Sequence, residues 1–278
     1  MAKFKSMRKR VVSGIILIGV SVAAIIVKPL CFITVVFLTL LGLWEFFSML
    51  EKKGVKLFKI FGLFLGGIIP LSIFFRFPVT REWQLFFILS GLFLLFLLEL
   101  TRKENQETIL SLSGTVFGVL YVSWCFSFII RIRALEGGVY LLAFLITVVK
   151  VQDIGAYLVG TFLGRRPLIK RVSPKKSVEG AVGGVLLSIL FAVLFRGFLK
   201  GVNLGQIVLL SFVLSVIGQL GDLFESLIKR DCGVKDSGRL ISGMGGVLDV
   251  IDSLIFTAPV FYFYFTMLKN ISFVHLIP

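Results

Sequence analysis

The chain has 278 residues, of which 57% are hydrophobic and 30 are phenylalanine, and its mean hydropathy is +1.01. Such an apolar composition excludes an ordinary water-soluble domain and favours a membrane protein. The formal net charge of +15 would suit a nucleic-acid partner. In so apolar a chain, basic residues that flank membrane spans are the better explanation, and no nucleic-acid partner is expected.

Apolar stretches long enough to cross a bilayer as helices, about 20 residues each, follow one another along almost the whole chain. Nine can be drawn, at 11–27, 30–49, 57–75, 83–99, 108–130, 138–161, 181–199, 204–227 and 247–268. The sequence therefore predicts an all-α, polytopic transmembrane protein with about nine spans. The first stretch follows basic residues, as in a secretory signal peptide, but it is long and lacks a small-residue cleavage site, so an uncleaved span is expected.

The basic residues divide unevenly between alternate connections. If the N-terminus is cytoplasmic, the inside segments hold 21 of the 30 lysines and arginines, the outside segments hold eight, and Lys150 lies within a span. Because positive charge accumulates on the cytoplasmic side, this distribution predicts a cytoplasmic N-terminus and an outside C-terminus. The chain is thus expected to be a multi-pass protein of the cell membrane.

The acids inside the predicted spans all fall in the cytoplasmic halves of those spans. They include Glu45, Asp153, Asp222, Glu225, Asp249 and Asp252. A count of lysines and arginines does not impose this alignment, so it independently predicts one polar cavity that opens to the cytoplasm. We expect two regions: residues 1–135, a hydrophobic multi-span part, and residues 136–278, which carry the chemistry.

Two pairs of acids flank a short basic connection near the C-terminus. Asp222 and Glu225 end one apolar run, and Asp249 and Asp252 begin the next. Residues three apart share a helix face, so the two pairs can point towards one another. Carboxylates at membrane depth are costly and usually functional, and hard oxygen ligands suit Mg²⁺. This segment predicts a magnesium-dependent site.

A second basic cluster occupies residues 164–180 and contains Ser173-Pro174-Lys175-Lys176-Ser177. Such a loop can serve topology or attract anionic lipid. It can equally clamp a triphosphate, because a proline-fixed turn brings two ammonium groups and flanking hydroxyls together. Lys150 lies three residues before Asp153, so the two can form a structural ion pair or a substrate contact.

Glycines fall into two groups. Gly62/Gly66, Gly160/Gly164 and Gly180/Gly184 have the spacing of close helix packing, which permits a homodimer without requiring one. Gly243, Gly245 and Gly246 immediately precede the last span. There, backbone N–H groups at a helix N-terminus can approach a phosphate.

The block from Ser226 to Asp252 resembles the signature of phosphatidate cytidylyltransferases, also called CDP-diacylglycerol synthases. The stretches Asp153–Tyr157 and Ser173–Gly180 resemble that family's other recurrent segment. The likeness covers residues from about 153 to 260, and the N-terminal half matches only as a hydrophobic region. Three family residues differ here: Ser242, Met244 and Val250 stand where the family has Pro, His and Arg. The one histidine, His275, lies in the predicted outside tail and cannot replace that His.

The resemblance implies that CTP and phosphatidate react to give CDP-diacylglycerol and pyrophosphate at the membrane lipid surface. It implies Mg²⁺, with room for a second cation, held by Asp222 and Asp249, with Glu225 and Asp252 as further ligands. The catalytic residues implied are Asp222, Asp249, Lys176 and Lys229. The substrate-binding residues implied are Ser173, Lys175, Lys176, Ser177, Asp153, Arg230, Lys235, Asp236, Gly245 and Gly246.

Three alternatives remain at this point. A cation- or proton-coupled transporter could use the same carboxylates, although no internal repeat is visible and the acids gather at one face. A polyprenol or phytol kinase-like phosphotransferase would share the chemistry. A non-enzymatic relative that has lost activity would be consistent with Met244 and Val250.

Overall fold

The structure is a computed structural model that describes residues 2–75, 81–102, 107–199 and 201–274. Within these ranges, side chains are not described at 2–10, 81–85, 87–88, 198 and 268–274. His275, like Arg76, Lys103 and Lys200 of the charge distribution, lies outside the described residues.

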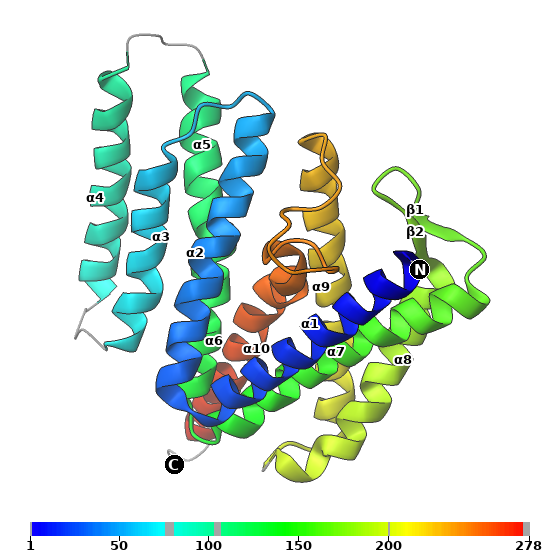
Figure 1. The fold of residues 1–278 in the computed structure, drawn as a ribbon. Helices are drawn as coiled ribbons and strands as arrows, with labels where there is room; N and C mark the ends of the chain where they lie inside the picture. Colours follow the sequence, from blue (N-terminus) through cyan, green and yellow to red (C-terminus); the bar gives the residue numbers. More distant parts are fainter. Residues whose placement is uncertain (1, 76–80, 103–106, 200, 275–278) are drawn as a thin grey trace. The chain divides into compact units, whose positions relative to one another are not determined.

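Helices make up nearly all of the described chain (Figure 1). They are α1 (Ala2–Ile26), α2 (Lys28–Lys52), α3 (Lys59–Phe74), α4 (Arg81–Leu100), α5 (Thr108–Gly118), α6 (Cys125–Ala134), α7 (Gly138–Leu163), α8 (Val178–Leu194), α9 (Leu204–Asp231) and α10 (Leu248–Val274). A π-helical turn, η1 (Val119–Trp124), joins α5 to α6, and a 3₁₀ turn, η2 (Phe195–Phe198), follows α8.

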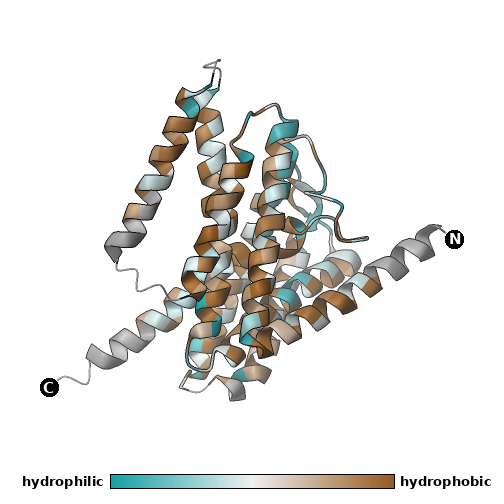
Figure 2. Cartoon of the chain, turned by 60° about the vertical axis from the view of Figure 1, so that its left-hand side comes forward, coloured by the Kyte–Doolittle hydropathy of each residue, from teal (hydrophilic) through white to brown (hydrophobic). Residues whose placement is uncertain are grey.

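Six helical segments of the described chain are long and apolar enough to cross a membrane. They are Lys28–Lys52, Thr108–Ala134, Gly138–Leu163, Val178–Gly197, Leu204–Asp231 and Leu248–Met267. Three shorter apolar helices, Val11–Ile26, Lys59–Phe74 and Leu89–Leu100, coincide with the other expected spans. Figure 2 shows apolar colouring along the helices and hydrophilic colouring at many helix ends and connections. The multi-pass membrane protein is therefore confirmed, while the number nine and the cytoplasmic N-terminus stay predictions.

The chain forms two compact units that do not follow a single boundary in the sequence. The first unit contains residues Met1–Ile130 together with Asp231–Val250, and the second contains Arg131–Arg230 together with Ile251–Pro278. The predicted regions 1–135 and 136–278 were distinguished by function, as a hydrophobic part and a catalytic part. The two compact units do not test that distinction. Each unit is described separately below.

In the first unit, α2 supplies the centre of the packing. Leu43, Phe46 and Phe47 are fully or almost fully buried. Gly62 of α3 lies against this helix, and a β-carbon there would come within 2.7 Å of the Phe47 ring. The predicted packing role of this glycine is confirmed, because any larger side chain would displace the aromatic core.

In the second unit, α7 and α8 lie side by side in close contact (Figure 1). A β-carbon at Gly180 would lie 2.7 Å from the Ala156 carbonyl oxygen, and one at Gly184 would lie 2.7 Å from the Gln152 carbonyl oxygen. The predicted small-residue packing is confirmed, and here it joins two helices of one chain.

The basic loop contains the one sheet among the described residues. Strand β1 (Pro167–Ile169) pairs antiparallel with β2 (Ser173–Ser177). This hairpin is a local addition to the predicted all-α fold. A run with Pro167 and Pro174 and without helical apolar spacing cannot continue α7, so the chain turns back before α8 begins.

Candidate functional site

Three of the predicted acids converge in the second unit. Asp222 and Glu225 lie one turn apart on α9, Asp252 lies one turn into α10, and one ligand oxygen of each lies within 4.8 Å of the others. Glu225 and Asp252 are buried, whereas Asp222 is half-buried. Gly221 permits this approach, because a β-carbon there would lie 2.9 Å from the Asp252 carbonyl oxygen.

Lysines compensate the acids. Lys176 of β2 forms an ion pair with Asp222, and Lys229 pairs with Glu225 one turn earlier on α9. Lys229 is itself buried. Two of the three acids therefore have an ammonium partner that offsets the cost of burying their charge, whereas Asp252 accepts a hydrogen bond from the Ser253 backbone N–H.

Lys150 and Asp153 form the pair that their spacing predicted. Lys150 Nζ lies 3.2 Å from Asp153 Oδ2 and donates to Ser253 Oγ at 3.2 Å. Ser253 Oγ in turn lies 3.3 Å from Asp153 Oδ2, and Ser253 follows Asp252 directly. This network ties α7 to the start of α10 beside the acid cluster.

The predicted clamp residues divide between structure and surface. Ser177 caps α8, because its Oγ accepts from the Gly180 N–H at 3.1 Å. Lys175 is exposed and Ser173 half-buried on β2. Arg230, at the end of α9, donates from Nε to the Val172 carbonyl oxygen at 3.3 Å, so it holds the hairpin as well as carrying charge.

Asp249 lies in the first unit, held by the connection between α9 and α10. Its Oδ2 accepts from Ser237 N at 3.0 Å, Ser237 Oγ at 2.9 Å and Gly246 N at 2.7 Å. Gly245 has φ +110°, a conformation that favours glycine. Gly245 and Gly246, two of the three glycines predicted to approach a phosphate, thus lie against a carboxylate at a helix N-terminus, a favourable position for negative charge. Lys235 and Asp236 are exposed on the same connection.

The sequence assigned no individual role to Glu45. This residue of α2 is 3% exposed, and its Oε2 accepts from Ser237 Oγ and from Leu248 N, both at 2.9 Å. Its position as an acid inside a predicted span was the available signal. The partner, however, lies 192 residues away in the chain, which spacing alone does not indicate.

The converging carboxylates fit a divalent cation chemically. Three hard oxygen donors from Asp222, Glu225 and Asp252 form the kind of set that Mg²⁺ accepts, which leaves further positions for water or phosphate oxygens. The fourth predicted ligand, Asp249, is not one of these three acids; it lies about one turn before Asp252 on α10, and its Oδ2 is held by Ser237 and Gly246.

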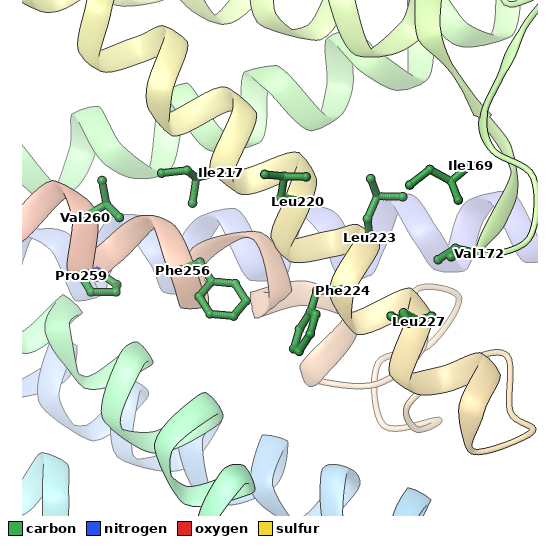
Figure 3. Close-up of a pocket in the computed structure, with 10 residues that line it drawn as sticks. All are labelled: Ile169, Val172, Ile217, Leu220, Leu223, Phe224, Leu227, Phe256, Pro259 and Val260. Atoms are coloured by element: carbon green, nitrogen blue, oxygen red, sulfur yellow. The ribbon is translucent and has the colours of Figure 1, made fainter.

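An apolar groove of about 510 Å³ lies in the second unit, along α9 and α10 (Figure 3). Leu220, Leu223 and Phe224 of α9 face it, with Phe256 of α10 and Ile169 of the hairpin. No ionisable side chain lines it among the described residues. It therefore suits neither a nucleotide nor a metal, and the polar chemistry belongs to the acid cluster beside it.

These features define a multi-pass membrane protein with a compensated carboxylate site. The chain belongs to the cytidylyltransferase family, whose model matches residues 8–268. Phosphatidate cytidylyltransferase of Bacillus subtilis is 32% identical to it, covering 92% of this chain and 97% of the relative. The Synechocystis enzyme of that name is 33% identical (94% and 97% covered), and that of Staphylococcus epidermidis is 35% identical (82% and 87%). The chain is thus a cytidylyltransferase enzyme, and the transporter and kinase-like alternatives are not favoured.

Cys232 provides a reporter for the connection after α9. It is 7% exposed, and burial raises the pKa of its thiol, as does the neighbouring Asp231, whereas Lys53 lowers it. Lys53 itself pairs with Asp231 at 2.6 Å. With Cys31 and Cys125 replaced by Ala, the pH of half-maximal alkylation should exceed the value of about 8.5 for an ordinary thiol.

Two substitutions should move that midpoint in opposite directions. Lys53→Met removes the cation that favours the thiolate, so the pKa of Cys232 should rise further. Asp231→Asn removes the anion that disfavours it, so the pKa should fall. Alkylation rates against pH measure both, and shifts in the same direction would contradict this electrostatic account.

Proposed function

We propose that this protein transfers the cytidylyl group of CTP to phosphatidate, giving CDP-diacylglycerol and pyrophosphate for phospholipid synthesis. The observation that carries the proposal is the cluster of Asp222, Glu225 and Asp252 compensated by lysines, in a chain whose relatives are named phosphatidate cytidylyltransferases. Both substrates carry anionic phosphate groups. Acids that can hold a metal ion, next to lysines that can neutralise phosphate, match this chemistry.

The proposed reaction requires no covalent bond between the protein and a substrate. A phosphate oxygen of phosphatidate attacks the α-phosphorus of CTP, a new P–O bond forms, and the bond from the α-phosphorus to the bridging oxygen breaks as pyrophosphate leaves. The nucleophile is already an anion and needs no strong base. Catalysis then consists of holding two mutually repelling anions in line and neutralising the charge that develops.

The acids hold the metal and the lysines neutralise phosphate in this proposal. Mg²⁺ would be held by Asp222, Glu225 and Asp252, with Asp249 one turn earlier on α10 and room for a second cation. Bound there, it would supply charge neutralisation and orient phosphate oxygens. Lys176 and Lys229 already face acid partners, and each can turn to a phosphate when metal takes over the carboxylate.

The remaining assignments concern substrate contacts. Lys175 and Lys235 are exposed, as a residue that meets CTP from water should be. The other proposed contacts are Ser173, Ser177, Asp153, Arg230, Asp236, Gly245 and Gly246. Ser177 and Arg230 would then combine a substrate contact with the structural bonds described above.

The proposed location is the cell membrane with the site on the cytoplasmic side, where CTP is made. The accumulation of basic residues in alternate connections supports it. Single cysteines at Lys170 and Arg239, both exposed, should resist a membrane-impermeant thiol reagent in intact cells and react after permeabilisation. Replacement of the three native cysteines provides the background. Labelling of either position from outside would overturn the orientation.

The reaction itself is the main test. Purified protein incubated with CTP, phosphatidate and Mg²⁺ should release pyrophosphate and form CDP-diacylglycerol, and chelation by EDTA should abolish both until Mg²⁺ is restored. Asp222→Asn should lose most turnover while still inserting, because an amide is a poorer metal ligand. Glu51→Gln, an acid on α2 paired with Lys59, is the control and should stay active. Full activity of the Asp222 variant would remove the metal-ligand role.

The lysine clamp makes a separate kinetic prediction. Lys176→Ala should lower kcat/KM for CTP about ten- to a hundredfold, since a charge-assisted hydrogen bond contributes roughly 1.5–3 kcal/mol. The dependence on phosphatidate should change less. Lys170→Ala, exposed between the same two strands, removes an equal charge and should have little effect. Equal losses in both variants would assign the loop to general electrostatic attraction, which added salt would mimic.

A further inference from the structure

We propose that Glu45 is a positioning residue for the reaction: its carboxylate clasps the connection between α9 and α10 and so fixes Asp249 at the start of α10. The inference rests on the proposed function, because Asp249 matters there as one of the acids for Mg²⁺. All the residues concerned lie in the first compact unit.

The clasp is buried and specific. One oxygen, Glu45 Oε2, accepts from the Ser237 hydroxyl and from the Leu248 backbone N–H, each at 2.9 Å. Leu248 is the first residue of α10, so its N–H is one of those that a helix leaves without an internal acceptor. Glu45 and Ser237 are 3% and 4% exposed, which keeps water from replacing either partner.

Ser237 connects Glu45 directly to Asp249. The Ser237 hydroxyl lies 2.9 Å from Asp249 Oδ2 as well as from Glu45 Oε2. The Ser237 and Gly246 backbone N–H groups complete the hold on Asp249. The carboxylates of Glu45 and Asp249 are therefore linked through Ser237. Displacing the Glu45 carboxylate would change the hydrogen bonds around Asp249.

Two glycines of the connection are explained by the same contact. A β-carbon at Gly238 would collide with the Glu45 carboxyl group, at 2.6 Å from its carboxyl carbon. At Gly246, a β-carbon would collide with Glu45 Oε2 and Ser237 Oγ, and it would lie 2.6 Å from Gly238 N. Backbone without side chains can wrap this closely around a carboxylate.

Two further contacts hold the same connection nearer the surface. Lys53 at the end of α2 pairs with Asp231, and Ser13 Oγ of α1 donates to the Ser242 carbonyl oxygen at 2.9 Å. Among the described residues, no cation within ion-pair distance of Glu45 is found. In this proposal, the buried Glu45 carboxylate, held by hydrogen bonds, fixes the backbone position of the connection.

The test compares Glu45→Gln, Glu45→Ala and Ser237→Ala with Glu51→Ala, an exposed acid on the same helix. The Mg²⁺ concentration for half-maximal activity should rise roughly tenfold in Glu45→Ala and Ser237→Ala, as expected when a buried hydrogen-bonded group loses its partner. It should rise less in Glu45→Gln, whose amide oxygen still accepts from Leu248 N–H. The KM for phosphatidate should stay near that of the wild type, and Glu51→Ala should leave both unchanged.

A second readout does not depend on catalysis. In a background with Cys31→Ala and Cys125→Ala, alkylation of Cys232 should be several-fold faster in Glu45→Ala and Ser237→Ala than in wild type, because the connection is released. If Glu45→Ala fails to insert, Glu45→Gln and Ser237→Ala carry both measurements.

The outcomes separate the two proposals. A lower kcat with unchanged Mg²⁺ dependence and unchanged Cys232 alkylation would reduce Glu45 to a general structural role and overturn the inference. If wild-type protein forms no CDP-diacylglycerol, the proposed function fails, and the alkylation rates alone decide whether Glu45 clasps the connection.

Discussion

Carboxylates within an apolar helical protein must be compensated, and the rest of this structure depends on how that is done. Three of the acids within the long apolar helices pair with lysines: Asp222 with Lys176, Glu225 with Lys229, and Asp153 with Lys150. Glu45 and Asp249 instead receive backbone N–H groups and the Ser237 hydroxyl. Removing Lys229 from the Glu225–Lys229 pair, the most buried of these, would leave a buried charge unpaired, which typically costs several kcal/mol. The contacts of Glu45 and Asp249 constrain the connection between α9 and α10, and the Asp222–Lys176 pair constrains the hairpin.

Close backbone contact makes the compensation possible. Gly221 lets α9 approach the start of α10, and Gly180 and Gly184 let α8 pack on α7. Lys150 belongs to α7, which is held by the contact with Gly180 and Gly184 of α8. Asp222 and Glu225 belong to α9, which contacts α10 directly at Gly221 and Asp252. The small residues contribute no chemistry of their own, but they set the distances at which side chains of opposite charge meet.

Much of this organisation could be predicted from local sequence. The neighbouring positions of Asp222 and Glu225, the Lys150–Asp153 pair and the glycine packing all follow from helical spacing, which is a local property. The sequence predicted that Asp249 would join the same cluster, which contains Asp252 but not Asp249. The hairpin of β1 and β2 was not predicted, because a short basic run with two prolines defines a break in a helix but not what replaces it. The clasp by Glu45 joins residues 192 positions apart, and no period in one sequence reports such a contact. The sequence predicted that Gly246 would approach a phosphate. It could not also indicate that the backbone of Gly246 lies against the carboxylates of Asp249 and Glu45, because Glu45 is distant in the chain.

The grouping of segment Asp231–Val250 with the N-terminal helices has a consequence for the modularity of the chain. The segment that carries the family signature lies late in the sequence, but α1 and α2 hold it through Ser13, Glu45 and Lys53. A fragment that begins at α7 would contain every proposed metal ligand and still lack the surface on which Asp249 is set. If Asp249 acts as proposed, the N-terminal helices contribute to the site through these contacts, although the motifs lie in the other half of the sequence.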